Sequence, residues 1–117
     1  MNFLEGLVGR SLEKRQLEER KSELKKVSLE ILENNQLIDF KNNNTKNEVR
    51  VSLDNIKDLK KLEEISDLIG SLGDNLNKLL ITDSSDIRNE AIIIARRKIV
   101  KIKEALGVQL VIVNNIL

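Results

Sequence analysis

The stretch LEEISDLIGSLGDNLNKLL, residues 62–80, has the clearest apolar pattern in the chain. Its apolar residues recur at steps of three and four, which brings them onto one face of a helix. They are Leu62, Ile65, Ile69, Leu72, Leu76 and Leu79. Because this spacing continues through Gly70 and Gly73, it favours one helix over about 54–80, with glycines that let a neighbour approach, over two helices that break at GSLG.

The composition of the chain agrees with a helical core. Its 117 residues suit one domain, 1–117, and hydrophobic residues make up 40% of them. Only two residues are aromatic, Phe3 and Phe40, so the core must be built from Leu, Ile and Val. Without cysteine the chain forms no disulfide framework. The sequence therefore predicts a single helical domain with an aliphatic core.

A further helix is predicted over residues 86–106. One of residues 83–86 caps its start, and Gly107 follows its end, where glycine is favoured. One broad arc of this helix is apolar and is expected to face the core. The arc consists of Ile87, Ala91, Ile94, Ala95, Ile99, Ile102 and Leu106.

The first third of the chain is mostly polar. Residues 1–9 form a short apolar segment, and residues 10–35 a long polar helix whose apolar face starts in a new register near Gly9. The apolar segment either folds back on the core or docks on a partner or a membrane surface. Leu17 and Leu24 are seven residues apart on the polar helix, the spacing of a sparse coiled coil. We predict that these two leucines contact another chain.

The remaining segments suggest a loop and two strands. The asparagine cluster at 41–47 is typical of a loop, and the alternating apolar residues of EVRVSL, residues 48–53, predict a strand. The β-branched tail 108–113 predicts a second strand, which either pairs with 48–53 or leaves an exposed edge for another chain. The expected fold is mainly α, a three-helix bundle or a coiled-coil-like hairpin of long helices with a possible two-stranded β element, 48–53 with 108–113.

The missing residue types exclude most enzyme classes. The chain has no His, Cys, Tyr or Trp, which removes the commonest general base and the commonest transition-metal ligand. TDSSD, residues 82–86, lacks the ligand spacing of a calcium loop and is better explained as a helix cap. We therefore predict no enzyme activity, no cofactor and no metal.

Charge and hydropathy leave two interpretations of the helix 86–106. Arg96, Arg97, Lys101 and Lys103 are candidate phosphate contacts for nucleic acid, although the formal net charge is only +1. Ile93 and Val100 lie among these cations as a second apolar stripe, which a phosphate-tracking helix does not need. We predict instead that these two apolar residues, like Leu17 and Leu24, pack against another chain.

The sequence favours a non-enzymatic structural or interaction protein that binds itself, as a homo-oligomer, or docks into a larger complex. A nucleic-acid-binding or regulatory protein that uses the basic face of 86–106 is the first alternative. A small helical inhibitor or immunity-type protein with one protein partner is the second. No apolar run reaches the ~20 residues of a transmembrane helix, and no signal peptide pattern is present. The expected location is the cytoplasm, or a viral or other macromolecular assembly.

Overall fold

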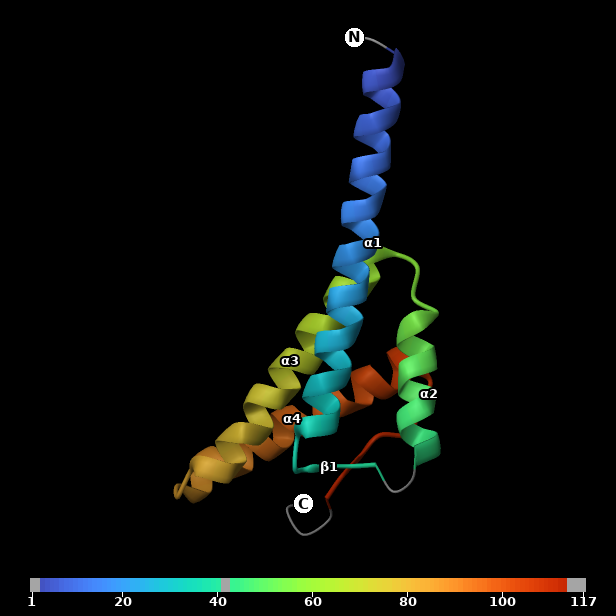
Figure 1. The fold of residues 1–117 in the computed structure, drawn as a ribbon. Helices are drawn as coiled ribbons and strands as arrows, with labels where there is room; N and C mark the ends of the chain where they lie inside the picture. Colours follow the sequence, from blue (N-terminus) through green and yellow to red (C-terminus); the bar gives the residue numbers. More distant parts are fainter. Residues whose placement is uncertain (1–2, 41–42, 114–117) are drawn as a thin grey trace.

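A computed structural model describes the backbone of residues 3–40 and 43–113 and the side chains of residues 13–40 and 44–113. Over these ranges the chain forms a mainly helical bundle with one small sheet (Figure 1). In chain order the elements are α1 (Phe3–Asn34), β1 (Ile38–Asp39), α2 (Asn43–Asp54), α3 (Leu59–Ile81), α4 (Ser85–Leu106) and β2 (Val111–Ile112). The predicted fold class, long helices with a two-stranded β element, is confirmed.

Helix α3 carries the centre of the core. All six apolar residues that define its 3–4 spacing are buried, and the helix runs without a break through GSLG, as predicted. Its predicted start near residue 54 was wrong, because Asp58 is the N-cap and its Oδ1 accepts a hydrogen bond of 3.1 Å from the backbone N–H of Lys60. Residues 55–58 instead link α2 to α3.

Only one of the two glycines in α3 lies at a close contact. A Cβ at Gly73 would lie 3.0 Å from Cγ2 of Ile31, so glycine lets α1 approach α3 there. A Cβ at Gly70 would meet no atom within 4 Å. The expectation that both glycines permit close approach therefore holds for Gly73 and was wrong for Gly70.

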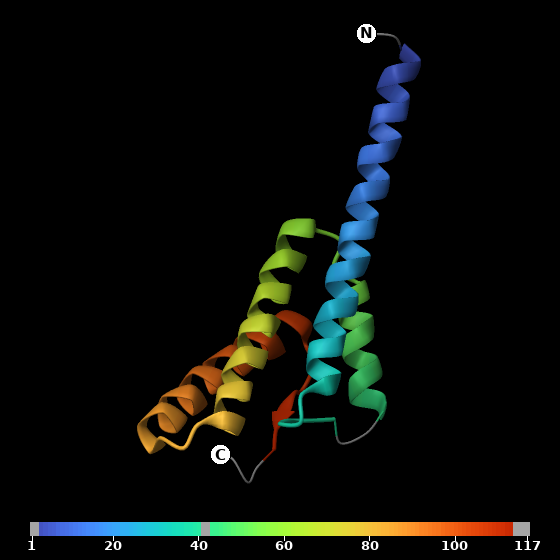
Figure 2. The same cartoon turned by 60° about the vertical axis from the view of Figure 1, so that its left-hand side comes forward.

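Helix α4 folds back along α3 after a connection of three residues, and the two helices form a hairpin (Figure 2). Ser84 caps its start by accepting a hydrogen bond of 3.4 Å from the N–H of Ile87. Gly107 ends it with φ of 66°, a conformation that costs other residues roughly 1–2 kcal/mol. The buried inner face of α4 consists of Ala91, Ala95, Ile99, Ile102 and Leu106.

Two residues of the apolar arc that was expected to face the core are less buried than predicted. Ile94 is only half-buried, and Ile87 is 51% exposed. Ile87 lies in the first turn of α4, beside the chain reversal, where the last turn of α3 leaves it half uncovered. The prediction that Ile87 belongs to the core was therefore wrong.

Helix α1 belongs to the bundle along only half of its length. Its second half packs on α3 and carries the buried or half-buried side chains, whereas its first half projects beyond the other helices (Figures 1 and 2). The side chains of the packed half include Leu24, Ser28, Ile31 and Leu32. The helix has 32 residues, about 48 Å at 1.5 Å per residue. The predicted change of apolar register near Gly9 does not interrupt the helix, since the backbone of α1 is helical from Phe3 onward. The side chains of the expected apolar segment 1–9 lie outside the described residues.

Helix α2 replaces the loop and the strand expected from the sequence. Residues 43–47 form its first turns, and residues 48–53 are helical. The fourth-residue spacing of Val49 and Leu53 buries both side chains on one face, while Val51 between them is 51% exposed. Residues 41 and 42 of the expected loop lie outside the described part of the chain.

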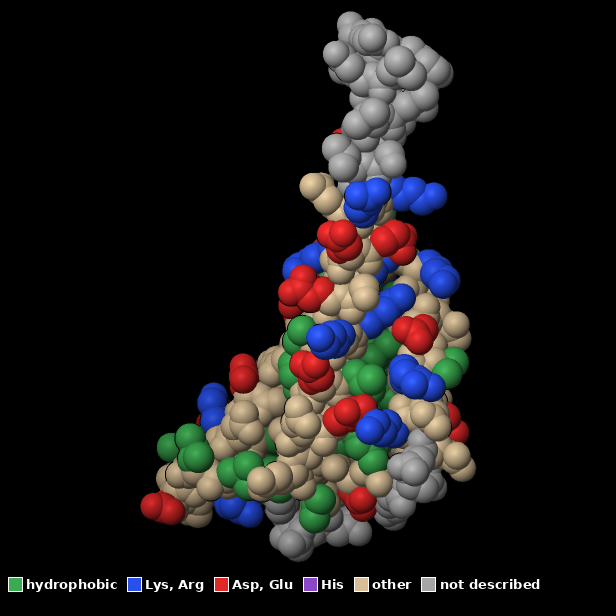
Figure 3. Space-filling model, in the orientation of Figure 1, with side chains coloured by type: hydrophobic (Ala, Val, Ile, Leu, Met, Phe, Trp, Pro, Cys, Tyr) green, Lys and Arg blue, Asp and Glu red, His purple; other side chains and the backbone are tan. Residues whose placement is uncertain are grey.

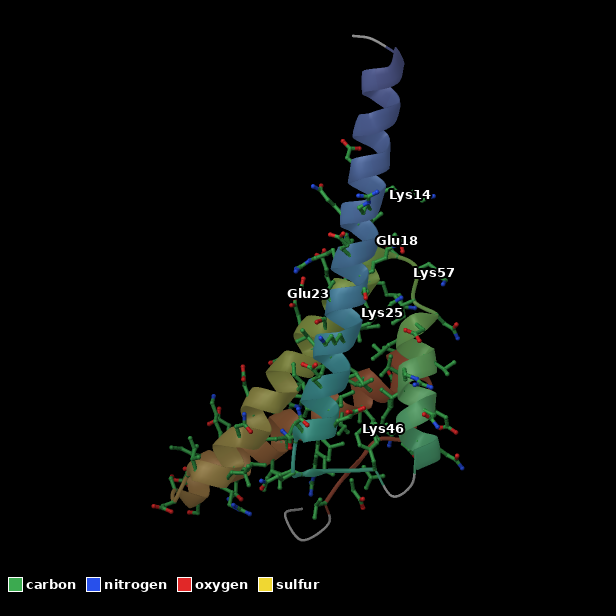
Figure 4. All side chains as sticks on the ribbon, in the orientation of Figure 1. Lys14, Glu18, Glu23, Lys25, Lys46 and Lys57 are labelled. Atoms are coloured by element: carbon green, nitrogen blue, oxygen red, sulfur yellow. The ribbon has the colours of Figure 1, made fainter. Side chains whose placement is uncertain are left out.

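Two polar contacts attach α2 to α1 (Figure 4). Lys46 Nζ lies 3.2 Å from Glu33 Oε1, and Lys25 Nζ donates a hydrogen bond of 3.3 Å to the backbone oxygen of Asp54. The second contact satisfies a carbonyl at the C-terminus of α2, where helices leave such groups unpaired.

The small sheet joins the end of α1 to the tail of the chain. Ile38 of β1 pairs with Ile112 of β2, and Asp39 pairs with Val111, in antiparallel register. The predicted strand 108–113 is therefore confirmed only at Val111–Ile112, and its predicted partner was wrong. Residues 48–53 are not available for pairing, because they form α2.

Candidate protein interface

The outer face of α4 is the first uncovered surface of the bundle. Residues at steps of four and three form a line along it, opposite the buried face of the helix. We call this line the outer stripe, and its members are Asp86, Glu90, Ile93, Arg97, Val100 and Glu104. All six are exposed, and the two apolar members, Ile93 and Val100, are 50% and 51% exposed. Half of each aliphatic side chain is therefore open to contact by another molecule.

The four predicted phosphate contacts lie on both sides of the line that joins Ile93 and Val100. Arg96, Arg97 and Lys101 are exposed, whereas Lys103 is half-buried. At 100° per residue, Arg97 and Lys101 lie on one side of the line from Ile93 to Val100, and Arg96 and Lys103 lie on the other. The structure thus places the cations around an apolar line and does not gather them into one continuous row.

A fifth cation of α4 contributes to the bundle itself. The Nζ of Lys98 donates a hydrogen bond to Ser71 Oγ on α3, and both side chains are partly buried. At the other end of the hairpin, Arg88 Nη1 donates a hydrogen bond of 3.2 Å to the backbone oxygen of Leu79. These two residues hold α4 against α3, which leaves the outer stripe facing away from the bundle.

The projecting half of α1 is the second uncovered surface. Every side chain from Glu13 to Arg20 is exposed, including Leu17 at 38%. Charges of both signs alternate over this part of the helix (Figure 3), and Glu18 pairs with Lys21 at 3.7 Å. Leu24, the second predicted contact, is half-buried against the core. The structure therefore leaves more of Leu17 than of Leu24 for a partner.

A third apolar surface lies at the closed end of the α3–α4 hairpin and was missed by the sequence analysis. Leu80 is 50% exposed, Ile81 is 81% exposed, and Ile87, across the turn, is 51% exposed. Figure 3 shows hydrophobic side chains at this end of the hairpin. The available signal was the apolar pair Leu80–Ile81, which extends past the last residue of the 3–4 pattern, Leu79. Such a pair directly before a turn has no place on the core face of a helix.

A metal site and a membrane span each set requirements with which the described residues can be compared. Among the described residues, no three carboxylates are close enough together to hold a metal ion. Within the same ranges no helix combines the length and apolar composition needed to cross a bilayer.

Comparison of the chain with protein-family models, with curated proteins and with solved structures finds no match in any of the three.

Proposed function

We propose that this chain is a non-enzymatic interaction protein that self-assembles or docks into a larger complex through helix packing. The observation that carries this proposal is the pair Ile93 and Val100, half exposed on a helix whose opposite face is already buried. Covering both side chains with another helix removes apolar area from water, which stabilises a complex by roughly 25 cal/mol per Å² before the costs of association. The cations around them keep their charged ends in water while their stems lie on the apolar surface.

The projecting half of α1 supports the same proposal. Outside the bundle, α1 depends on its own hydrogen bonds and on charge pairs such as Glu18–Lys21, which stabilise a helix by only ~0.2–0.5 kcal/mol each. Isolated helices shorter than ~12–15 residues are marginal in water. A partner that covers Leu17 would stabilise this helix as well as add contact area, so we assign Leu17, and to a lesser extent Leu24, to an interface between chains.

Two other functions use the same surfaces. Nucleic-acid binding is favoured by the exposed cations Arg96, Arg97 and Lys101, but Glu90 and Glu104 on the outer stripe would repel phosphates. An inhibitor or immunity-type protein would present the same apolar residues to a different protein, in a complex with one copy of each chain. We rank nucleic-acid binding below self-assembly, because phosphate contact does not explain a line of apolar residues flanked by both signs of charge. The inhibitor alternative uses the same apolar line, and the measured mass of the chain alone distinguishes it from self-assembly.

Sedimentation velocity and light scattering over a concentration series test the proposal. The wild type should gain mass with concentration, and the double variant Ile93→Ser with Val100→Ser should remain at the mass of one chain. Val51→Ser is the matched control, since Val51 is exposed to the same extent on α2. Leu17→Glu tests the projecting helix in the same assay. If the double serine variant associates as strongly as the control, the outer stripe is not the interface.

A nucleic-acid titration separates the first alternative. Phosphate contacts by four cations would give an affinity that falls with salt at a log-log slope of about −3 to −4. We expect no such complex. Tight, salt-sensitive binding that is lost in Arg96→Gln with Arg97→Gln would replace self-assembly with nucleic-acid binding.

A further inference from the structure

The charges of the outer face of α4 are divided along its length. Asp86 and Glu90 lie in the first half of the helix, and Arg97 and Lys101 lie in the second half. All four side chains are exposed, and none of them forms an ion pair with another residue that the structure describes. The outer face thus begins with two acidic residues and continues with two basic ones before Glu104, and Ile93 lies between the acidic and the basic pair.

This division is unfavourable within a single chain. Asp86 and Glu90 are four residues apart, as are Arg97 and Lys101, so each pair places like charges next to each other on the helix. The helix dipole explains Asp86, which lies in the first turn, but it acts only over the end turns and does not explain Glu90 or Arg97. A second molecule that brings opposite charges to the two pairs would relieve this repulsion.

We infer that the outer face of α4 binds the same face of a second copy of this chain, with the two α4 helices antiparallel around a two-fold axis. This inference rests on the proposed function and names its partner. If the two-fold axis passes between residues 93 and 94, Glu90 of one copy lies opposite Arg97 of the other along the helix axes. Asp86 then lies opposite Lys101, and the two-fold axis repeats both contacts.

The side chains also lie on matching sides of the interface. Relative to Ile93, the positions of Glu90, Arg97 and Lys101 are rotated in the same direction around α4. When two antiparallel helices are related by a two-fold axis perpendicular to them, the same side of each helix lies on the same side of the interface. The acidic residues of one copy therefore meet the basic residues of the other. Ile93 lies beside its own counterpart near the axis, where burial excludes water from both isoleucines.

The charges also select this register over the apolar alternative. Pairing Ile93 with Val100 of the second copy shifts the centre to between Arg96 and Arg97. That register places Arg97 beside Arg97 of the second copy, so that like charges face each other near the two-fold axis. Like charges that face each other disfavour a register, whereas opposite charges favour it. The acidic and basic pairs therefore specify the offset between the two helices.

The resulting dimer should be weak and sensitive to salt. One helix face per copy buries less area than the ~1,600 Å² of a standard stable interface. Ion pairs between exposed side chains are individually weak and are screened by salt. Association should therefore weaken several-fold between low and high ionic strength, with the apolar contact of Ile93 remaining.

Charge reversal with mixing tests the inference. Glu90→Lys and Arg97→Glu should each weaken self-association by about tenfold or more, because each converts two attractive contacts into two repulsive ones. A 1:1 mixture of the two variants restores opposite charges at both contacts and should form mixed dimers with the wild-type affinity. Each variant also replaces a like-charge pair within its own helix by an opposite-charge pair, which can change the stability of the single chain. Thermal unfolding followed by circular dichroism therefore checks that both variants are folded. Glu48→Lys on α2 is the control for net charge.

Each outcome of this experiment decides the inference. Weakened single variants with recovery on mixing support it. Weakened variants without recovery overturn the register, and unchanged self-association of both variants overturns the charge pairing. If self-association is unchanged by charge but lost in Ile93→Ser with Val100→Ser, the proposed function stands while this inference fails. A wild type that stays at the mass of one chain at all concentrations overturns the homodimer and leaves docking to a different protein.

Discussion

The inner line of α3 and the outer stripe of α4 have the same spacing, but they have different roles in the molecule. In α3, six aliphatic residues at steps of three and four are buried against α1 and α4. In α4, six residues at the same steps are exposed, and four of them are charged. Spacing alone aligns side chains on a helix. The side-chain chemistry then decides whether the line becomes core or stays available to a partner.

The two halves of α1 repeat this contrast within one helix. The second half, with Leu24, Ile31 and Leu32, packs on the core. In the projecting half, the described side chains run from Glu13 to Arg20, and among these only Leu17 is apolar. That half projects so far that the molecule measures 64 × 30 × 21 Å. A sparse apolar line thus extends a helix beyond the body without closing a core around it.

Replacing one residue of each line with alanine gives the largest predicted difference in the free energy of unfolding. Leu72→Ala should lower the free energy of unfolding by about 2–5 kcal/mol, because Leu72 is fully buried and leaves a cavity. Val100→Ala should change it by less than ~0.5 kcal/mol, since its side chain faces solvent in the single chain. Chemical denaturation at a dilution that keeps the chain monomeric measures both. Equal losses would mean that the outer stripe also belongs to the core of the monomer.

The glycines of α3 provide a smaller and more local test of the inner line. Gly70→Ala should stabilise the protein by up to ~1 kcal/mol, because the helix is continuous and the new methyl group meets no neighbour. Gly73→Ala should gain less or lose stability, since its methyl group would contact Ile31 at 3.0 Å. Paired thermal melts measure the difference. An equal gain at both positions would show that α1 does not press on α3 at Gly73.

Much of the hairpin was predictable because its signals repeat. Six apolar residues in phase identified α3 despite its two glycines, and the interval between a cap within residues 83–86 and Gly107 defined α4. The second apolar stripe, Ile93 with Val100, was also visible in the sequence. Its exposure was predictable as well, because the stripe lies among the cations and away from the apolar arc that faces the core.

The errors arose where short patterns fit two structures. In residues 48–53 three apolar residues alternate, which suggests a strand, but Val49 and Leu53 are also four apart and share a helix face. Residues 38–39 form too short a strand to leave a periodic signal. The exposed hairpin end was missed because Ile87 falls in phase with the core arc, although α3 ends beside it.

A disulfide cross-link tests the central claim, that the outer stripe is an interface between copies, most directly. The chain has no cysteine, so a single Ile93→Cys variant places its only thiol beside the two-fold axis. Two cysteines form a disulfide when their Cα atoms come within about 4.4–6.8 Å. Val51→Cys is the matched control, since Val51 is equally exposed on α2. Under mild oxidation Ile93→Cys should form covalent dimers rapidly and Val51→Cys slowly. Equal, slow cross-linking of the two variants would contradict the claim.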